Sequence, residues 1–390
     1  MRSHSGFRAL LIIGDGVGTI KSVYIQESPV RPESDIDFRL VRYPSFDHDE
    51  KTVDGIPDGT AELPMNGSLE AGAIWLDGDA GHQLYQFNGV GRMATDGRLK
   101  VSWAEAAYLL ERDELTSVDG MGFETFLSAP PDSLAIDRWL VYRDLRSRGY
   151  YLSTAYEPGE SPTVTKVDFL VRPRGAAPTS DEVAHRMNVV NEATVVHLPS
   201  IVSMTLAVAD DEGELTYIDI EPFTPRGSTS IDHWLPSKGR RVGQRVLVRE
   251  PSDMMVSPGF FGSDLGESSI LLNALEAWYL DEMDLLDVAD CPSPEDEKQA
   301  VVYRALRDHG CVPRSGLKFG ADFRVYTDVA DASDPGHSSY LVEVVDGEAT
   351  FTPRILSRAV RLAGGVRKRH VIAAVDGTEL DWYEVERKRP

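Results

Sequence analysis

The strongest constraint on this chain is that it repeats itself. The run LVYRDLRSRG at 140–149 returns almost letter for letter as VVYRALRDHG at 301–310. The run TLAVADDEGELTYIDI, which begins at Thr205, is matched by VIAAVDGTELDWYEVE near the end of the chain. Stretches with the same pattern of apolar positions bury the same faces, so they are expected to fold alike. We therefore predict an α/β (α+β) fold made by tandem duplication, each copy having a small N-terminal α/β subdomain and then a mixed-sheet subdomain.

Composition divides the chain into four segments. Residues 1–64 include a long stretch rich in Pro, Asp and Ser with few periodic apolar positions. We interpret them as an N-terminal extension of unknown role with partial disorder. Residues 65–222 form the first copy and residues 242–390 the second. Between them, residues 223–241 are polar and rich in Pro, Gly and Ser, which is typical of a linker.

Helix signals recur at matching places in the two copies. The run from 101 to 115 has apolar residues at helical spacing, and Ser102 with Glu105 three residues later predicts a capping box. Its counterpart in the second copy is predicted to begin at Ser269. Another helix is predicted to end at Gly149, because glycine readily takes the left-handed conformation that follows a helix.

Several classes of protein are excluded by what the sequence lacks. No run of about 18 apolar residues exists, which excludes a membrane span. The run GDGVG near the start lacks the spacing of a dinucleotide-binding loop, so no nucleotide cofactor is expected. The two cysteines, Cys291 and Cys311, have no partner at metal-ligand spacing. This predicts a reduced, cytoplasmic protein without structural zinc.

The charge is strongly acidic and its composition is unusual. The formal net charge is −23, and Lys supplies only 9 of the 40 basic residues. An acid-rich, lysine-poor surface is typical of proteins from salt-loving archaea, where molar salt screens charge within a few ångströms. The alternative is an ordinary acidic cytosolic protein.

Three reactive side chains stand at the ends of short β-like runs in the second copy: Tyr326, His337 and Lys368. A phenol, an imidazole and an ammonium can supply a base, an acid and a cation for transfer at phosphorus. The aligned positions of the first copy hold other residues: Arg172, Glu182 (or a neighbour, if the loop gaps differently) and Val202. One copy is therefore predicted to be catalytic and the other structural.

The second copy carries the run YRALRDHG…SGLKFGADFRVY…GHSSYLVEVV…RLAGGVRKRHVIAAVD. It resembles the catalytic unit of the archaeal tRNA-splicing endonucleases, and the resemblance covers about residues 65–390. Two fused units, the first degenerate, resemble the homodimeric class of salt-loving archaea. The resemblance implies a nuclease-like C-terminal subdomain and an enzyme that excises introns from precursor tRNA. Such an enzyme cuts both splice sites of a bulge–helix–bulge and leaves 2′,3′-cyclic phosphate and 5′-hydroxyl ends, without metal or cofactor.

The resemblance also implies roles for the reactive residues. Tyr326 would act on the base side, His337 as the acid and Lys368 as the cation that stabilises the phosphorane. A free tyrosine is a weak base at neutral pH. Tyr326 therefore needs help from Lys368 or a neighbouring arginine, or it mainly orients the substrate.

Four further residues are implied to bind RNA. Arg361 and Trp382 would clamp a flipped-out bulge base between guanidinium and indole. Arg367 and Arg369 would hold phosphates. As an isolated feature, Trp382 could equally be an edge-strand aromatic packed on the core.

Two features predict assembly. By resemblance, an acidic hairpin of the first copy would dock into a basic pocket of a catalytic unit through Asp210, Asp211 and Glu212. The final strand, which begins near Leu380, has no successor in the sequence, and an unpaired edge suits the pairing of units across an interface. Because only one copy is reactive, two cuts need two chains, and a homodimer is predicted.

Alternatives of other classes stay open at this point. Asp322, Glu343 and Lys368 could imitate the scattered acidic pattern of metal-dependent nucleases, although Glu343 and Lys368 are not on one short strand. A non-catalytic RNA-binding scaffold is a second alternative. A rarer class of the same family fuses three units, but residues 1–64 are too short for a third complete unit, so the two-unit form is expected.

Overall fold

The computed structural model describes residues 65–155, 167–230, 234–257, 259–329, 331 and 333–390. The predicted extension 1–64 lies outside these residues. All of the described residues belong to one compact unit, Thr60–Pro390. Within the part of the chain described here, no helix is both long and apolar enough to span a bilayer.

The two N-terminal subdomains have the same topology. The first is a five-stranded sheet in the order β3-β4-β2-β1-β5, and the second is a five-stranded sheet in the order β14-β15-β13-β12-β16. The elements of the first are β1 Asn66–Glu70, β2 Ala73–Leu76, α1 Gly78–Asn88, β3 Arg92–Met93, β4 Leu99–Val101, α2 Trp103–Glu111, β5 Ser117–Val118 and α3 Phe123–Leu127. Those of the second are β12 Ser237–Val242, β13 Arg245–Arg249, α5 Asp253–Val256, β14 Ser263–Gly266, β15 Ser269–Leu272, α6 Ala274–Glu282 and β16 Leu286–Asp287.

The capping box predicted in the first copy forms, and the structure shows a second one in the other copy, but both helices are shorter than predicted. Ser102 and Glu105 cap α2 reciprocally, and Asn273 with Glu276 does the same for α6. The prediction of a helix over 101–115 is wrong at both ends, because Val101 pairs in β4 and the backbone turns left-handed at Asp113. The counterpart predicted from 269 is likewise wrong at its start, since 269–272 pair as strand β15.

The segment 223–241, expected to be a linker, contains the start of a strand. β12 begins at Ser237 and pairs with β13 and β16, so the second N-terminal subdomain starts before residue 242. The Pro, Gly and Ser content that suggested a linker is concentrated in the residues before this strand.

The two C-terminal subdomains share one ten-stranded mixed sheet. Its strand order is β17-β18-β19-β21-β22-β11-β10-β8-β7-β6, so each half mirrors the other. The strands are β6 Leu152–Thr154, β7 Phe169–Val171, β8 His185–Asn191, β10 Met204–Ala209, β11 Leu215–Pro222, β17 Val312–Ser315, β18 Phe323–Tyr326, β19 Tyr340–Asp346, β21 Arg369–Asp376 and β22 Glu379–Lys388. A two-stranded sheet pairs β9 Val196–His197 with β20 Thr350–Phe351. The remaining helices are α4 Ala135–Ser147, α7 Glu297–Asp308, α8 Pro353–Gly365 and the 3₁₀ turns η1 Leu198–Ser200 and η2 Leu317–Phe319.

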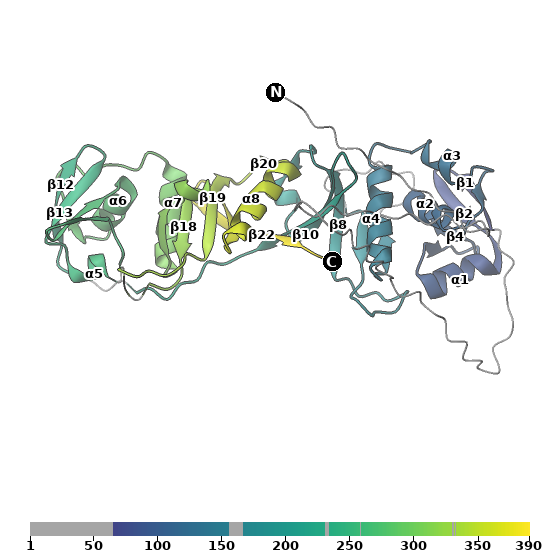
Figure 1. Ribbon diagram of the computed structural model, residues 1–390, viewed down its shortest axis with the longest axis horizontal. Helices are drawn as coiled ribbons and strands as arrows, with labels where there is room; N and C mark the ends of the chain where they lie inside the picture. The colour runs from purple at the N-terminus through teal and green to yellow at the C-terminus, as the bar shows by residue number, and fades with distance from the viewer. Residues whose placement is uncertain (1–64, 156–166, 231–233, 258, 330, 332) are drawn as a thin grey trace, which may run out of the picture. The chain divides into compact units, whose positions relative to one another are not determined.

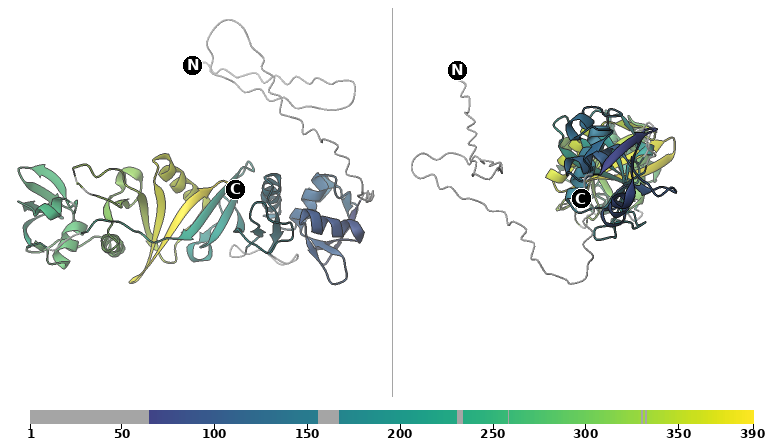
Figure 2. Two further views of the ribbon diagram at one scale, coloured as in Figure 1. Left: turned by 90° about the horizontal axis from the view of Figure 1, so that it is seen from below. Right: turned by 90° about the vertical axis from the view of Figure 1, so that its right-hand side faces the viewer.

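The last strand of the chain joins the two copies. β22 runs antiparallel to β11, the last strand of the first copy, from Tyr217 opposite Lys388 to Pro222 opposite Tyr383. Figure 2 shows the yellow β22 lying beside the teal strands of the first copy. The edge that the sequence leaves without a successor is therefore paired within the chain.

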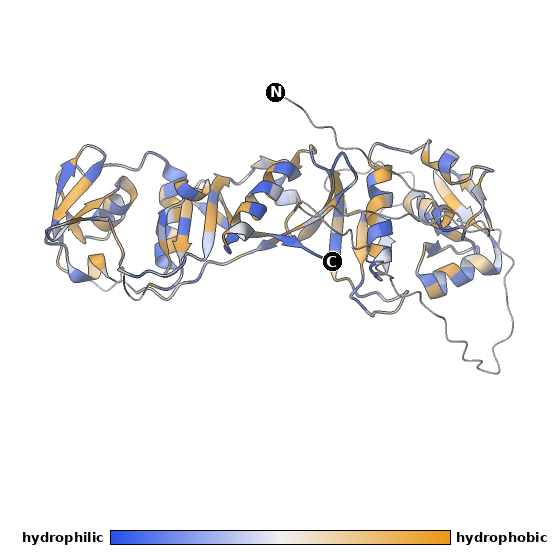
Figure 3. Ribbon diagram, viewed as in Figure 1, coloured by the Kyte–Doolittle hydropathy of each residue, from blue (hydrophilic) through white to orange (hydrophobic). Residues whose placement is uncertain are grey.

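Helices cover the second half of this sheet on both faces (Figure 1). Val302 and Leu306 of α7 pack with Val371 and Ala373 of β21 on one face. On the other face, Leu356 and Val360 of α8 pack with residues such as Ile372, Ala374 and Val385. Successive strand residues point to opposite faces, so these two clusters assign each residue of β21 and β22 to a face. Because both faces are covered, β21 is apolar at every position from Val371 to Val375, and Figure 3 shows orange, apolar segments in the strands of this half.

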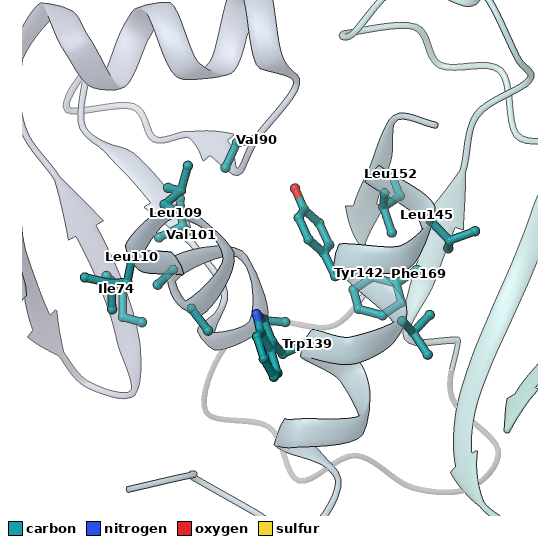
Figure 4. Close-up of a cluster of buried hydrophobic side chains, with 14 of the residues drawn as sticks. Ile74, Val90, Val101, Leu109, Leu110, Trp139, Tyr142, Leu145, Leu152 and Phe169 are labelled. Carbon is teal, nitrogen blue, oxygen red and sulfur yellow. The ribbon is translucent and has the colours of Figure 1, made fainter. Parts of the chain in front are cut away.

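The first copy is built around α4, which links its subdomains. Tyr142 is completely buried, meets Tyr108 edge to face at 5.3 Å between ring centroids, and packs on Phe169 (Figure 4). The second copy repeats this with Tyr303 and Tyr279, whose centroids are 5.8 Å apart. As predicted, Gly149 follows α4 with a positive φ of 83°.

Candidate active site

An aspartate that binds the neighbouring strand aligns the two copies residue by residue. The backbone N–H of Asp168 donates to the Met187 carbonyl at 2.7 Å, and that of Asp322 donates to the Val342 carbonyl at 3.1 Å. Each carboxylate also accepts a backbone N–H two residues further along β8 or β19. Because both copies make the same two bonds, Asp168 corresponds to Asp322, and the residues of β7 align with those of β18 without a gap. The residue four positions after the aspartate is Arg172 in the first copy and Tyr326 in the second.

The partner strands extend the alignment to Lys368 and, with one extra residue in the loop of the second copy, to the region of His337. Met187 and Val342 pair in parallel with Thr205 and Val371, so β10 and β21 are matched too. Three positions before those partners stand Val202 in the first copy and Lys368 in the second. Counting back five positions from Met187 and Val342 gives Glu182 and His337. The aligned positions are those that the sequence comparison gave.

Strand register sets Tyr326 and Lys368 in one row. The last bridge between β18 and β19 and the first bridge between β19 and β21 share Tyr340. One position outward from those bridges lie Tyr326, Ser339 and Lys368. Strands are about 4.8 Å apart, so the Cα atoms of Tyr326 and Lys368 are separated by roughly 10 Å, and side chains of one row share a face.

Lys368 is tied to the loop that carries His337. Its Nζ donates to the Ser338 carbonyl at 2.7 Å, and Ser338 directly follows His337. The imidazole of His337 itself is exposed. Burial lowers the pKa of the Lys368 ammonium, and the positive charges of Arg324 and Lys318 lower it further. The ammonium therefore lies where a negative ligand would be stabilised.

Tyr326 is held by the N-terminal subdomain of its own copy. The side chain is 7% exposed and meets the ring of Phe260 edge to face at 5.7 Å. Val312 and Val329 complete this small apolar cluster. Packing of this kind fixes the direction of the phenol, because a buried ring has few rotamers available.

The predicted RNA-binding arginines have different surroundings. Arg361 is exposed on α8 and lines a cleft of about 460 Å³ together with Lys368 and Arg369. Arg367 is exposed in the left-handed turn before β21. Arg369 already has a carboxylate partner, because its guanidinium forms an ion pair with Glu384. Its charge is therefore partly neutralised.

Arg361 and Trp382 do not come together within one chain. Trp382 is 8% exposed and packs in the core on the α7 face of the sheet, with Ala373 as its neighbour on β21. Arg361 belongs to α8 on the opposite face. The side chains of β22 alternate, so the aromatic residue on the α8 face is Tyr383. Within one chain, Trp382 and the helix that carries Arg361 therefore lie on opposite faces of the sheet, and the clamp on an RNA base stays a prediction.

The acidic hairpin of the first copy is well ordered by its own aspartate. Asp210 Oδ1 accepts the backbone N–H groups of Glu212 and Glu214, at 3.0 and 2.8 Å. Asp211 and Glu212 point to solvent. Asp210 therefore shapes the turn, while the other two predicted interface residues are free to meet a partner.

This hairpin lies beside α8 of the second copy. Asp210 and Glu214 line a cleft of about 260 Å³ whose other wall includes Arg358 and Arg361. The α8 helix has no equivalent of its length in the first copy, where the chain makes only the turn η1 between β9 and β10. The basic helix is thus particular to the copy that carries the three reactive side chains.

Sequence reasoning missed two basic residues that lie close to Lys368. Arg324 stands on β18, and Lys318 on η2 lies at 5.2 Å from the ring of Phe319. Lys368 is 5.5 Å from the same ring. The alignment held a signal for Arg324, because Leu170 occupies its position in the first copy.

The candidate metal ligands do not form a cluster. Among the described residues, no three His, Cys, Asp or Glu side chains are grouped so that they could hold a metal ion. Asp322 is engaged by Gln299 Nε2 at 2.9 Å and by the Val344 backbone. Both cysteines are free thiols, and burial raises the pKa of Cys291 and of Cys311 to about 11.

Comparison with known proteins agrees with this geometry. The family model for the tRNA intron endonuclease N-terminal domain matches residues 65–127, and the model for its catalytic C-terminal domain matches residues 297–382. The tRNA-splicing endonuclease of Haloferax volcanii is 41% identical over 343 residues, covering 84% of this chain and 100% of the relative. That of Halobacterium salinarum is 39% identical over 350 residues, and that of Natronomonas pharaonis is 39% identical over 340 residues, each with 84% of this chain and 100% of the relative covered. These relatives come from halophilic archaea, in keeping with the acidic, lysine-poor composition.

Proposed function

The chain belongs to the tRNA-splicing endonuclease family and is an enzyme, and from that premise we propose how it excises introns from precursor tRNA. It cuts both splice sites of a bulge–helix–bulge. Each cut leaves a 2′,3′-cyclic phosphate and a 5′-hydroxyl, by acid/base catalysis that uses no metal and no cofactor. The observation that carries this proposal is the bond from Lys368 Nζ to the Ser338 carbonyl, beside His337 and in the row of Tyr326.

The reaction needs three kinds of group. The ribose 2′-oxygen attacks the adjacent phosphorus, and the bond from phosphorus to the 5′-oxygen breaks. A base accepts the 2′-hydroxyl proton, an acid gives a proton to the departing 5′-oxygen, and a cation stabilises charge on the phosphorane oxygens. The nucleophile belongs to the RNA itself, so the protein need not supply one.

We assign these roles to the three aligned residues. Lys368 is the cation, because its ammonium is held by a neutral carbonyl rather than by a carboxylate and keeps its charge for the phosphate. His337 is the acid, since its exposed imidazole can reach a leaving group. Tyr326 acts on the side of the base, and its rigid packing against Phe260 suits a group that orients the 2′-hydroxyl.

The two copies have different roles, one catalytic and one structural. The catalytic copy comprises residues 237–390, because β12 begins at Ser237. Residues 223–236 join it to the structural copy, residues 65–222, and residues 1–64 are an extension. One chain has one set of reactive residues, whereas the substrate has two splice sites. We propose a homodimer in the archaeal cytoplasm, with Asp211 and Glu212 contacting a catalytic copy of the second chain.

One incubation tests the reaction. A precursor tRNA with a bulge–helix–bulge is mixed with the protein in EDTA and concentrated salt, and the product ends are analysed. Cleavage at two sites with cyclic phosphate ends supports the proposal. Loss of cleavage in EDTA, restored by magnesium, would instead support the metal-dependent nuclease that uses Asp322, Glu343 and Lys368.

A matched pair of variants tests the site. His337→Ala removes the proposed acid, so cleavage should fall by about 10²-fold or more while RNA binding stays nearly unchanged. Glu182→Ala changes the aligned residue of the first copy and should leave cleavage as it is. If both variants cut like the parent, His337 is not the acid.

The arrangement of Asp322 argues against the metal-dependent alternative. The Asp322 carboxylate accepts a backbone N–H of the neighbouring strand. Asp168 accepts the equivalent N–H in the first copy, which lacks all three reactive side chains. A residue with the same bond in both copies serves the fold that they share. An RNA-binding scaffold without catalysis is the remaining alternative, and the EDTA experiment distinguishes it by the absence of any product.

A further inference from the structure

Arg324 lies beside Lys368, and among the described residues its guanidinium has no hydrogen-bond or ion-pair partner. The residue lies on β18 and is half-buried, and its Nε atom is buried with no hydrogen-bond partner. In the described part of the chain its one recorded contact is with the ring of Tyr326, 6.0 Å from the ring centroid. Burying an unsatisfied charged donor is costly. A group like this is kept where a ligand supplies the missing acceptor.

Strand register points Arg324 at the same site as the reactive residues. It precedes Tyr326 by two positions, so both side chains share a face and their Cα atoms are roughly 7 Å apart. Arg324 is paired with Leu341 on β19, an apolar residue that offers it no acceptor. Glu343, on the same face of β19, lies beside His370 with 3.6 Å between Glu343 Oε2 and His370 Nε2.

Three like charges gather here. The pKa of the Lys368 ammonium is lowered first by burial and then by Arg324 and Lys318, and among the described residues no carboxylate is found to raise it. Lys318 and Lys368 both approach the ring of Phe319, at 5.2 and 5.5 Å. Crowding cations without a counter-ion opposes folding, and a bound anion removes that cost.

The first copy has lost these charges along with the reactive groups. Leu170 stands in the position of Arg324 and Val202 in the position of Lys368. Both replacements are apolar, so they dispense with any need for an anion. A charge kept for the shared fold would have been needed in both copies.

We propose that Arg324 is a phosphate-binding residue, and that with Lys368 and Lys318 it forms an anion site for the phosphate that is cut. Arg324 donates two N–H groups to one non-bridging oxygen or to a pair of them, while Lys368 acts as a point charge on the phosphorane. The identity of the phosphate rests on the proposed function. The existence of the anion site does not.

The test uses the full chain and inorganic phosphate as the probe. The lysine side chains are labelled with ¹³C-methyl groups and observed by NMR. The signal of Lys368 is identified by its absence in Lys368→Arg. Phosphate is then titrated at a fixed chloride concentration. Arg324→Leu introduces the residue of the first copy, and Arg324→Lys keeps the charge without the planar donor group. Arg245→Leu is the matched control, because Arg245 is exposed on β13 in a different sheet and the change in charge is the same.

In Arg324→Leu, phosphate should bind at least about ten-fold more weakly than in the parent chain, as expected for the loss of a hydrogen bond between charged groups. The Lys368 signal should titrate at higher pH, because one repelling charge is gone. Arg324→Lys should lie between the two, and Arg245→Leu should match the parent. Equal phosphate affinity in the parent and in both Arg324 variants would overturn the proposal, and circular dichroism shows whether each variant is folded.

Cleavage separates this inference from the function on which it rests. With a bulge–helix–bulge RNA, Arg324→Leu should slow single-turnover cutting by about 10²- to 10³-fold while the RNA still binds. If the parent chain does not cut this RNA, the proposed function fails, and the phosphate titration still decides whether Arg324 belongs to an anion site. If Arg324→Leu cleaves at the same rate as the parent chain, Arg324 does not bind the phosphate that is cut.

Discussion

The paired aspartates Asp168 and Asp322 allow a quantitative comparison inside one chain. Both carboxylates accept a backbone N–H of the neighbouring strand, at 2.7 and 2.8 Å. They differ in their second partner. Asp168 binds Arg138 Nε at 2.6 Å, with both side chains almost completely buried, whereas Asp322 binds the neutral amide of Gln299. Replacing each by alanine therefore removes the same backbone bond but leaves different groups behind.

The expected costs follow from those partners. Asp322→Ala leaves a partly buried N–H and an amide without an acceptor, which costs about 1–3 kcal/mol of unfolding free energy. Asp168→Ala leaves the buried guanidinium of Arg138 with Asp132, which is 2.8 Å away and partly exposed. Removing one partner of a buried ion pair costs about 3–5 kcal/mol. The second charge partner keeps the value near the lower end, and the first-copy variant should still be the less stable one.

The cleavage rate should be affected in the opposite order, with Asp322→Ala the more damaging of the two substitutions. Asp322 lies four residues before Tyr326 and ties β18 to β19, so its loss should loosen the row that holds Tyr326 and Lys368. We expect Asp322→Ala to slow cleavage by the folded protein, and Asp168→Ala to leave the rate of the folded fraction unchanged. Thermal unfolding in concentrated potassium chloride and single-turnover cleavage below both transitions provide the two measurements. Greater destabilisation by Asp322→Ala than by Asp168→Ala would refute the reasoning about the partners.

Three further predictions concern single residues. Burial lowers the pKa of His370 to about 4 from an ordinary value of 6.5, so the unfolded chain takes up the proton first and stability falls as pH drops from 6.5 towards 4. His370→Leu should remove up to about 3 kcal/mol of that pH dependence, measured by unfolding at pH 7 and pH 4.5, and an unchanged slope would contradict it. Trp382→Ala should destabilise the protein by about 3–5 kcal/mol because the ring is in the core. An RNA-binding defect with an unchanged melting temperature would instead support a contact between Trp382 and an RNA base. Arg361→Ala should reduce the slope of log binding constant against log salt by about 1 if the exposed guanidinium contacts one phosphate, and an equal slope would show that it does not.

Much of the fold and part of the site could be predicted because they depend on local pattern. The duplication, the capping box at Ser102 and the glycine after α4 each depend on a short stretch of chain. The alignment of Tyr326 and Lys368 with Arg172 and Val202 agrees with the strand register, because the repeat keeps the same spacing between its strands. The predicted helices are too long, because the chain turns left-handed at Asp113 and at its counterpart Asp284. Asp tolerates this conformation, but its presence in a sequence does not predict it.

The sequence by itself determined that this chain folds twice into one kind of unit and that only the second copy carries the reactive side chains. Tertiary structure decided which strands are neighbours. The pairing of β22 with β11 joins residues far apart in the chain, and the sheet that results assigns Trp382 to the α7 face and Arg361 to the α8 side. The same sheet brings Lys368 to the Ser338 carbonyl and leaves Arg324 Nε without a hydrogen-bond partner among the described residues. Alternation along a strand is local, but the order of strands in a sheet is set by long-range hydrogen bonds, and an active site at the end of several strands depends on that order.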